Sequence, residues 1–262
     1  IMYRLATCFW VSISTASPQG LSGAPKYDLS NLLALRGEIA RGEITRGDSV
    51  FHDLQGTKEE ILKIEDLLKR NNWQVSSYMG KNGTEESFLN MHGKSPKLLH
   101  LATHGFYYTP NRAENVDYLK GYTDAMSLSG LVLSGGNAAW LGKPLPKGVL
   151  GGILSANDIA RLDLSNTDMV VLSACQTGQG KATSEGLYGL QRAFKKAGVG
   201  TIVMSLWSVS DKTTSEFMTT FYERLADKKN AWNKRKAFEE AKEIIRKEHP
   251  GPYYWAAFVM LD

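Results

Sequence analysis

The sequence predicts an α/β protein in which helices cover both faces of a mostly parallel central sheet. Short apolar runs bounded by turn residues recur along the chain, for example at residues 98–103 and 168–173, and such runs are typical of buried parallel strands. Between them lie stretches whose apolar residues recur at helical spacing. Strands that alternate with helices form a parallel sheet with helices packed on its two sides.

The first part of the chain is expected to contain strands and short helices. Residues 3–14 mix aromatic and β-branched side chains, which indicates a strand, and we expect it at an edge of the sheet. Thr57 and Glu60 have the spacing of a capping box, so a helix is expected to begin at Thr57. The predicted helices are 29–44, 57–70 and 84–92, and a further strand is predicted at 73–78.

The remainder of the chain continues this alternation. Residues 135–152 contain six glycines and two prolines, and this composition predicts a mobile loop. Ser155 is expected to cap a short helix with Asp158 in its first turn. Helical spacing marks 187–197, 217–225 and 237–245, and strands are predicted at 127–134, 168–173, 201–206 and 253–261.

Composition limits the classes of protein to which the chain can belong. It has 262 residues, of which 42% are hydrophobic, enough for one large α/β domain. A net charge of +4 forms no dense basic patch, so nucleic acid is not an expected partner. The only cysteines are Cys8 and Cys175, which argues against a disulfide framework and for a reducing compartment. No apolar run approaches the roughly 20 residues of a membrane span.

Two of the predicted strands stop at reactive side chains. Strand 98–103 is followed by His104 and Gly105, and strand 168–173 is followed by Cys175. Ligands and chemistry in open α/β sheets lie beyond the carboxyl ends of the strands, so the imidazole and the thiol are expected on one rim. A nearby base turns a thiol into a nucleophile. This arrangement predicts a cysteine peptidase, with His104 as proton donor and the N–H groups of Gly105 and Cys175 as oxyanion donors.

Other interpretations of these residues stay open. A lone cysteine or histidine at the end of a strand is most often a packed structural residue. His100 and His104 would point to the same face of one strand, which suggests a metal, but no third ligand is recognisable. Residues 178–181 resemble a phosphate loop only faintly, because Ala182 follows the lysine. We predict no metal or cofactor, and a peptide-binding module without turnover is the main alternative to an enzyme.

Several motifs in a fixed order resemble those of the CHAT domain, a caspase-like peptidase module related to separase. The resemblance covers residues 51–262 and leaves residues 1–50 as an N-terminal extension of strand and helix. The motifs are DLQGTKEEI at 53–61, ATHGF at 102–106, LVLSG at 131–135, GILSA at 152–156, VLSACQTG at 171–178, SLWSVSD at 205–211 and YYWAAF at 253–258.

The resemblance implies a caspase-like three-layer α/β/α sandwich with His104 and Cys175 as a catalytic dyad. CHAT domains often follow tetratricopeptide repeats in bacteria. The resemblance therefore implies a bacterial protein with an upstream repeat or regulatory domain. The low cysteine count and the lack of a membrane-length apolar run predict a cytoplasmic setting and no membrane partner. A chain that begins at Ile1 is interpreted as a piece of a longer protein. The implied function is limited proteolysis of a protein partner.

The resemblance also implies that residues 204–211 line the substrate cleft. A peptide substrate in such a cleft binds as an added extended strand, through main-chain hydrogen bonds. Asp211 resembles the acidic residue with which separase receives arginine, which implies cleavage after Arg or Lys, although a helix N-cap at Ser210 or Asp211 is an equal alternative. The candidate substrate-binding residues are Ser173, Trp207, Ser208, Val209 and Asp211.

Overall fold

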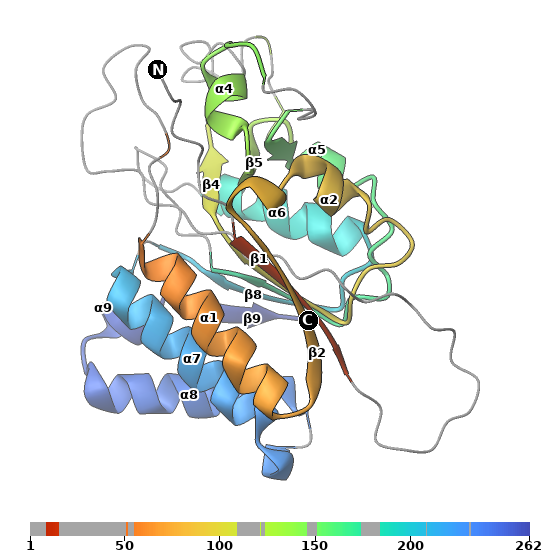
Figure 1. Ribbon diagram of the computed structural model, residues 1–262. Coiled ribbons are helices and arrows are strands. Elements are labelled where there is room, and N and C mark those ends of the chain that lie inside the picture. The colour runs from red at the N-terminus through yellow and green to blue at the C-terminus, as the bar shows by residue number, and fades with distance from the viewer. Residues whose placement is uncertain are drawn as a thin grey trace, which may run out of the picture.

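The computed structural model describes residues 9–15, 51, 55–108, 121, 124–145, 151–173, 184–207, 209–230 and 232–262. A six-stranded sheet in the order β2-β1-β3-β7-β8-β9 forms its centre (Figure 1). Its strands are β1 (Phe9–Thr15), β2 (Trp73–Met79), β3 (Leu98–Ala102), β7 (Met169–Leu172), β8 (Thr201–Ser205) and β9 (Phe258–Leu261).

Most strands of this sheet run in one direction, as the sequence predicts. Strand β7 pairs in parallel with β3 on one side and with β8 on the other. Strands β2 and β3 both pair antiparallel with β1, so β2 also runs the same way as β3. Strand β9 pairs antiparallel with β8. Four of the six strands therefore share one direction, and β1 and β9 are reversed.

Helices cover both faces of the sheet, which gives three layers (Figure 1). On one face, helix α7 contacts both α1 and α8, and α9 contacts α8. On the other face lie α2, α5 and α6, with α5 against α6. The first group is α1 (Gln55–Arg70), α7 (Asp211–Ala226), α8 (Lys234–Glu248) and α9 (Pro252–Trp255). The second group is α2 (Glu85–Leu89), α5 (Ala156–Ile159) and α6 (Ser184–Lys196).

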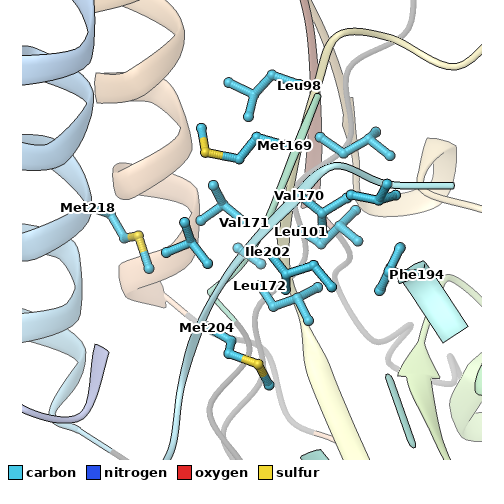
Figure 2. Close-up of a cluster of buried hydrophobic side chains, with 14 of the residues drawn as sticks. Leu98, Leu101, Met169, Val170, Val171, Leu172, Phe194, Ile202, Met204 and Met218 are labelled. Atoms are coloured by element: carbon cyan, nitrogen blue, oxygen red, sulfur yellow. The ribbon is translucent and has the colours of Figure 1, made fainter. Parts of the chain in front are cut away.

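The hydrophobic core lies between these layers. Every residue of β3, β7 and β8 is buried, which explains why these strands are unbroken apolar runs rather than alternating ones. Figure 2 shows Met218 of α7 on one side of these strands and Phe194 of α6 on the other. The α/β class with a mostly parallel sheet is thereby confirmed, and the arrangement is consistent with a caspase-like fold.

A second, three-stranded antiparallel sheet, β4-β5-β6, follows the carboxyl end of β3. The sequence predicts one strand over 98–103 with His104 after it, but β3 ends at Ala102 and β4 begins at His104. Between them, the Thr103 hydroxyl donates to the main-chain oxygen of Val132 at 2.5 Å, which draws the chain to β5. The strands are β4 (His104–Tyr107), β5 (Ser129–Val132) and β6 (Ile153–Ser155).

The predictions for the N-terminal part need two corrections. The strand expected at an edge, β1, lies inside the sheet between β2 and β3. The capping box at Thr57 and Glu60 is wrong, because α1 already begins at Gln55 and both residues are fully buried. They share the buried face of α1 with its apolar residues, since their spacing matches the helical period. The helix expected at 29–44 lies outside the described residues.

The glycine-rich segment 135–152 contains a helix, α4 (Gly136–Trp140), where a loop is expected. Its glycines allow close approach of the main chain. Gly152 has a φ of 79°, and a Cβ there would lie 2.4 Å from the nitrogen of Gly136. Residues 146–150 of this segment lie outside the described residues.

For the rest of the chain, one local prediction is confirmed and another is partly wrong. Ser155 caps α5, with Asp158 completing a capping box. The final predicted strand at 253–261 is partly wrong, because helix α9 precedes the shorter strand β9. Within the described ranges, no helix combines the length and apolarity that a membrane span requires.

Candidate active site

The carboxyl ends of β3, β7 and β8 form one rim of the central sheet. Leu101 of β3 is opposite Leu172 of β7, and Leu172 is opposite Met204 of β8. The N–H of Ser173 donates to the main-chain oxygen of Leu101 at 2.9 Å, so the pairing extends one residue past β7. The fold therefore brings the segments that follow these three strands to the same edge, where chemistry in open α/β sheets is found.

His104 lies at this rim as the first residue of β4. Its side chain is 2% exposed, and its backbone is opposite Val132 of β5. The imidazole packs against the ring of Phe51, with 5.0 Å between ring centroids. Gly105 is the next residue of β4 and is opposite Leu131. The imidazole is thus held by packing at the junction of the two sheets.

Phe51 is itself held in place by Asn137 of α4. The N–H of Phe51 donates to Asn137 Oδ1 at 2.7 Å, and Asn137 Nδ2 donates to the Phe51 oxygen at 2.9 Å. The Phe51 ring also packs edge-on against Trp140 at 5.1 Å, and Phe106 packs against Trp140 at 5.1 Å. These contacts make an apolar wall beside His104.

A buried polar cluster lies beneath the rim. Ser173 Oγ donates to Glu60 Oε1 at 2.8 Å, and His100 Nε2 is 3.1 Å from the same oxygen. His100 Nδ1 is 2.9 Å from the Tyr222 hydroxyl. All four side chains are at most 3% exposed. We call Glu60, Ser173, His100 and Tyr222 the Glu60 cluster.

The Glu60 cluster changes the interpretation of two residues. His100 and His104 belong to different sheets, and both ring nitrogens of His100 contact Glu60 or Tyr222. The hydroxyl of Ser173, a candidate pocket residue, is bonded to Glu60 in the interior. Burial raises the pKa of the Tyr222 hydroxyl well above its ordinary value, and the Glu60 carboxylate adds to this rise. Tyr222 therefore stays neutral and can donate a hydrogen bond within the cluster.

The segment after β8 holds the other candidate residues. Leu206 is 39% exposed, and its N–H donates to the oxygen of Ala257 at 2.8 Å. The indole nitrogen of Trp207 donates to the oxygen of Tyr253 at 2.9 Å, so this partly exposed ring is fixed to α9. Val209 is 2% exposed and belongs to the main core.

Three candidate positions are described incompletely or not at all. Cys175 and Ser208 lie outside the described residues. Asp211 is the first residue of α7, but only its place in the helix is described. Of the two possible N-caps, Ser210 takes that role, because its side chain accepts from the N–H of Thr213.

Sequence reasoning missed Phe51, Asn137 and the part that Glu60 plays. Phe51 stands two residues before the first motif, and Asn137 lies in the segment interpreted as a loop. No periodicity marks either residue. A charged residue on the apolar face of α1 was the available signal for Glu60, because a carboxylate is seldom fully buried unless it is paired.

Comparison with known proteins places this fold in a family. A sequence model of the CHAT domain matches residues 12–262. Tetratricopeptide repeat protein 28 of Mus musculus is 32% identical over 111 residues, which is 42% of this chain and 4% of that protein. Tetratricopeptide repeat protein 28 of Homo sapiens matches with the same identity and coverage. The chain aligns with only a small part of these relatives. The family model, however, matches nearly the whole chain. The chain therefore belongs to the caspase-like CHAT domain family.

Proposed function

We propose that the chain is a cysteine endopeptidase that performs limited proteolysis of a protein partner. The register between β3 and β7 carries this proposal. The last residue pair of that register is Leu101 and Leu172. His104 comes three residues after Leu101, and Cys175 comes three residues after Leu172. Cys175 is two residues past Ser173 in the sequence. This supports a thiol and an imidazole on one rim of the sheet.

In the proposed reaction, the Cys175 thiolate attacks the scissile carbonyl carbon and forms an acyl-enzyme. His104 takes up the thiol proton and delivers it to the departing amine. The N–H groups of Gly105 and Cys175 are the proposed donors to the oxyanion. Water then attacks the acyl-enzyme and releases the acid, which restores the thiol. Phe51 supports this role of His104, because its ring restrains the imidazole.

The proposed substrate is an extended peptide bound beside the segment that follows β8, with Arg or Lys before the cleaved bond. Trp207 supports this, because its indole is fixed and partly exposed at the rim. Ser173, Ser208 and Val209 remain proposed contributors, although the Val209 side chain is buried. Ser210 caps α7, so capping alone does not account for Asp211, the proposed partner of the basic side chain.

The test is labelling of the protein with peptidyl ketone electrophiles that end in Arg, Lys, Asp or Leu. We expect the Arg and Lys probes to label Cys175 selectively over Cys8, as mapped by peptide mass spectrometry. His104→Ala should slow this labelling by about 100-fold, the usual scale of general acid–base catalysis. His92→Ala, which changes an exposed histidine, is the control. Asp211→Ala should remove the preference for basic probes, and an unchanged preference would reject the pocket.

A latent or catalytically silent peptide-binding module is the second candidate function. It is favoured by the burial of His104, which is 2% exposed and has to become accessible to a substrate. An associated tetratricopeptide repeat segment is a proposed regulator, because the relatives carry that repeat in their names. Equal labelling of Cys175 and Cys8, with retained binding of an extended peptide, would favour this second function over the first.

A further inference from the structure

The Glu60 cluster joins side chains from four segments of the chain, and two of its three bonds are made to the Glu60 carboxylate. Glu60 comes from α1, His100 from β3, Tyr222 from α7, and Ser173 directly follows β7. Glu60 Oε1 accepts the Ser173 hydroxyl and contacts His100 Nε2. One oxygen therefore links the helix layer to two neighbouring strands near their carboxyl ends.

A carboxylate is energetically unfavourable at the fully buried position of Glu60. The buried positions of α1 that follow Glu60 are apolar, namely Ile61, Ile64 and Leu68. Taking a carboxyl group out of water is unfavourable unless hydrogen bonds compensate for the lost hydration. An apolar side chain would serve packing equally well, so packing does not explain Glu60. Directional bonds do, because they hold their partners in one geometry.

Among the partners of Glu60, Ser173 lies nearest in sequence to Cys175. We call the residues that follow Ser173 and include Cys175 the Cys175 segment. The N–H of Ser173 is bonded to the Leu101 oxygen, and its hydroxyl is bonded to Glu60. Main chain and side chain of Ser173 are thus restrained from two directions. Cys175 is two residues further along the chain, and Ser173 is the last described residue before it.

We propose that Glu60 is a positioning residue, which acts through the Ser173 hydroxyl to fix the end of β7 and thereby the departure of the Cys175 segment. The purpose of this arrangement rests on the proposed peptidase function. The restraint on β7 itself does not depend on that function, so the two are tested separately.

The test uses Ser173→Ala and Glu60→Met, which remove the bond, and Glu60→Gln, which keeps an acceptor oxygen. The matched control is Thr167→Ala. Thr167 is 1% exposed and its hydroxyl donates to the Pro96 oxygen at 2.7 Å, just before β7 and β3 begin. It offers an equivalent buried hydroxyl bond between the same two strands, at the end away from the rim.

Two measurements are made on folded protein, well below the unfolding temperature of each variant. The first is the rate of Cys175 labelling as a function of peptidyl ketone concentration. We expect Ser173→Ala and Glu60→Met to lower the maximal rate by about 10- to 100-fold, because small misplacements of reacting groups have effects of this size. The half-saturating concentration should stay unchanged. Glu60→Gln should restore most of the rate, and Thr167→Ala should match the wild type.

The second measurement is amide hydrogen exchange of the peptide that contains Ser173. We expect faster exchange in Ser173→Ala and Glu60→Met and wild-type exchange in Glu60→Gln and Thr167→Ala. The proposal is overturned if exchange of this peptide is unchanged in Ser173→Ala and Glu60→Met, or if both variants label as fast as Thr167→Ala. If wild-type Cys175 shows no selective labelling, the peptidase function fails, and hydrogen exchange alone decides whether Glu60 fixes the end of β7.

Discussion

At the scale of single residues, polar side chains in the interior are tied to the candidate site. His100 is fully buried and lies between Glu60 and Tyr222, with 3.1 Å and 2.9 Å separating the bonded atoms. Each of these groups compensates another for its lost hydration, since a buried polar group is stable only when it is hydrogen-bonded. Removing one hydroxyl should therefore cost more here than at the surface.

Tyr222→Phe is expected to lower the free energy of unfolding by about 1–3 kcal/mol, because it removes the hydroxyl that meets His100 Nδ1 in the interior. Tyr254→Phe is the matched control, because Tyr254 is 38% exposed, and it should change stability by less than about 0.5 kcal/mol. Urea unfolding of the two variants measures both values. Equal stability would show that the hydroxyl contributes nothing to the Glu60 cluster.

At the scale of elements, α4 and the small sheet support His104 through main-chain contacts. The N–H of Leu133 donates to the Gly152 oxygen at 2.6 Å, and the N–H of Gly152 donates to Glu85 Oε2 at 2.9 Å. These bonds hold the backbone around α4, which carries Asn137 and through it Phe51. The glycine-rich segment is thus part of the packing behind the candidate general acid.

Gly152→Ala tests this close packing. Its Cβ would lie 2.4 Å from the nitrogen of Gly136 at a φ of 79°, so we expect a loss of more than about 1 kcal/mol of stability. Gly142→Ala is the control, because Gly142 has a φ of 61° but nothing within 4 Å of its Cβ position. Thermal unfolding should show the larger loss for Gly152→Ala. Equal losses would mean that backbone strain alone, without steric contact, explains the effect.

At the scale of the whole molecule, the carboxyl ends of the parallel strands β3, β7 and β8 lie at one rim of the sheet, and helices cover both of its faces (Figure 1). The helix layer of α7 and α8 packs tightly on β9. Phe217 stacks on Phe258 with 3.9 Å between centroids, and Phe238 packs against Phe217 at 5.5 Å. These contacts join α7, α8 and β9, and the stability of the whole molecule also depends on pH through its carboxyl groups.

Hydrogen bonds from Ser127 hold the pKa of Asp124 below its ordinary value. Bonds from Ser165 lower the pKa of Asp163 in the same way, and a bond from Arg235 lowers the pKa of Asp262. A lowered folded-state pKa contributes stability that is present above the ordinary pKa of 3.8 and is lost as the pH falls through the folded-state value. Glu85 contributes to the pH dependence of stability with the opposite sign, because burial raises its pKa.

We expect the unfolding temperature to fall as the pH drops from about 5 to below 3. Among the described carboxyl groups with a shifted pKa, three have a lowered pKa and only Glu85 has a raised one. Asp124→Asn should reduce this fall, and it should lower the unfolding temperature most at neutral pH. Thermal unfolding across this range provides the measurement. A parallel fall in Asp124→Asn and the wild type would exclude a contribution from Asp124.

By itself, the sequence determined the α/β class, the main strands and the family. Residues 98–102, 169–172 and 201–205 are continuous apolar runs, and their burial on both faces follows from that local pattern. Ser155 caps α5 as predicted, because its bond to the N–H of Asp158 joins residues only three apart. The motifs around His104 and Cys175 indicated the CHAT domain, which the family match confirms.

The tertiary structure alone decided where β1 lies and what surrounds the candidate site. The strand pattern of residues 9–15 says nothing about neighbours, and β1 lies between β2 and β3. Asn137 and Phe51 are 86 residues apart, and Ser173 and Glu60 are 113 apart. Local spacing reports only on residues within a turn of helix or a few positions along a strand. Glu60 therefore looked like a helix cap in the sequence, and only its contacts with His100 of β3 and with Ser173 after β7 make it the centre of a buried cluster.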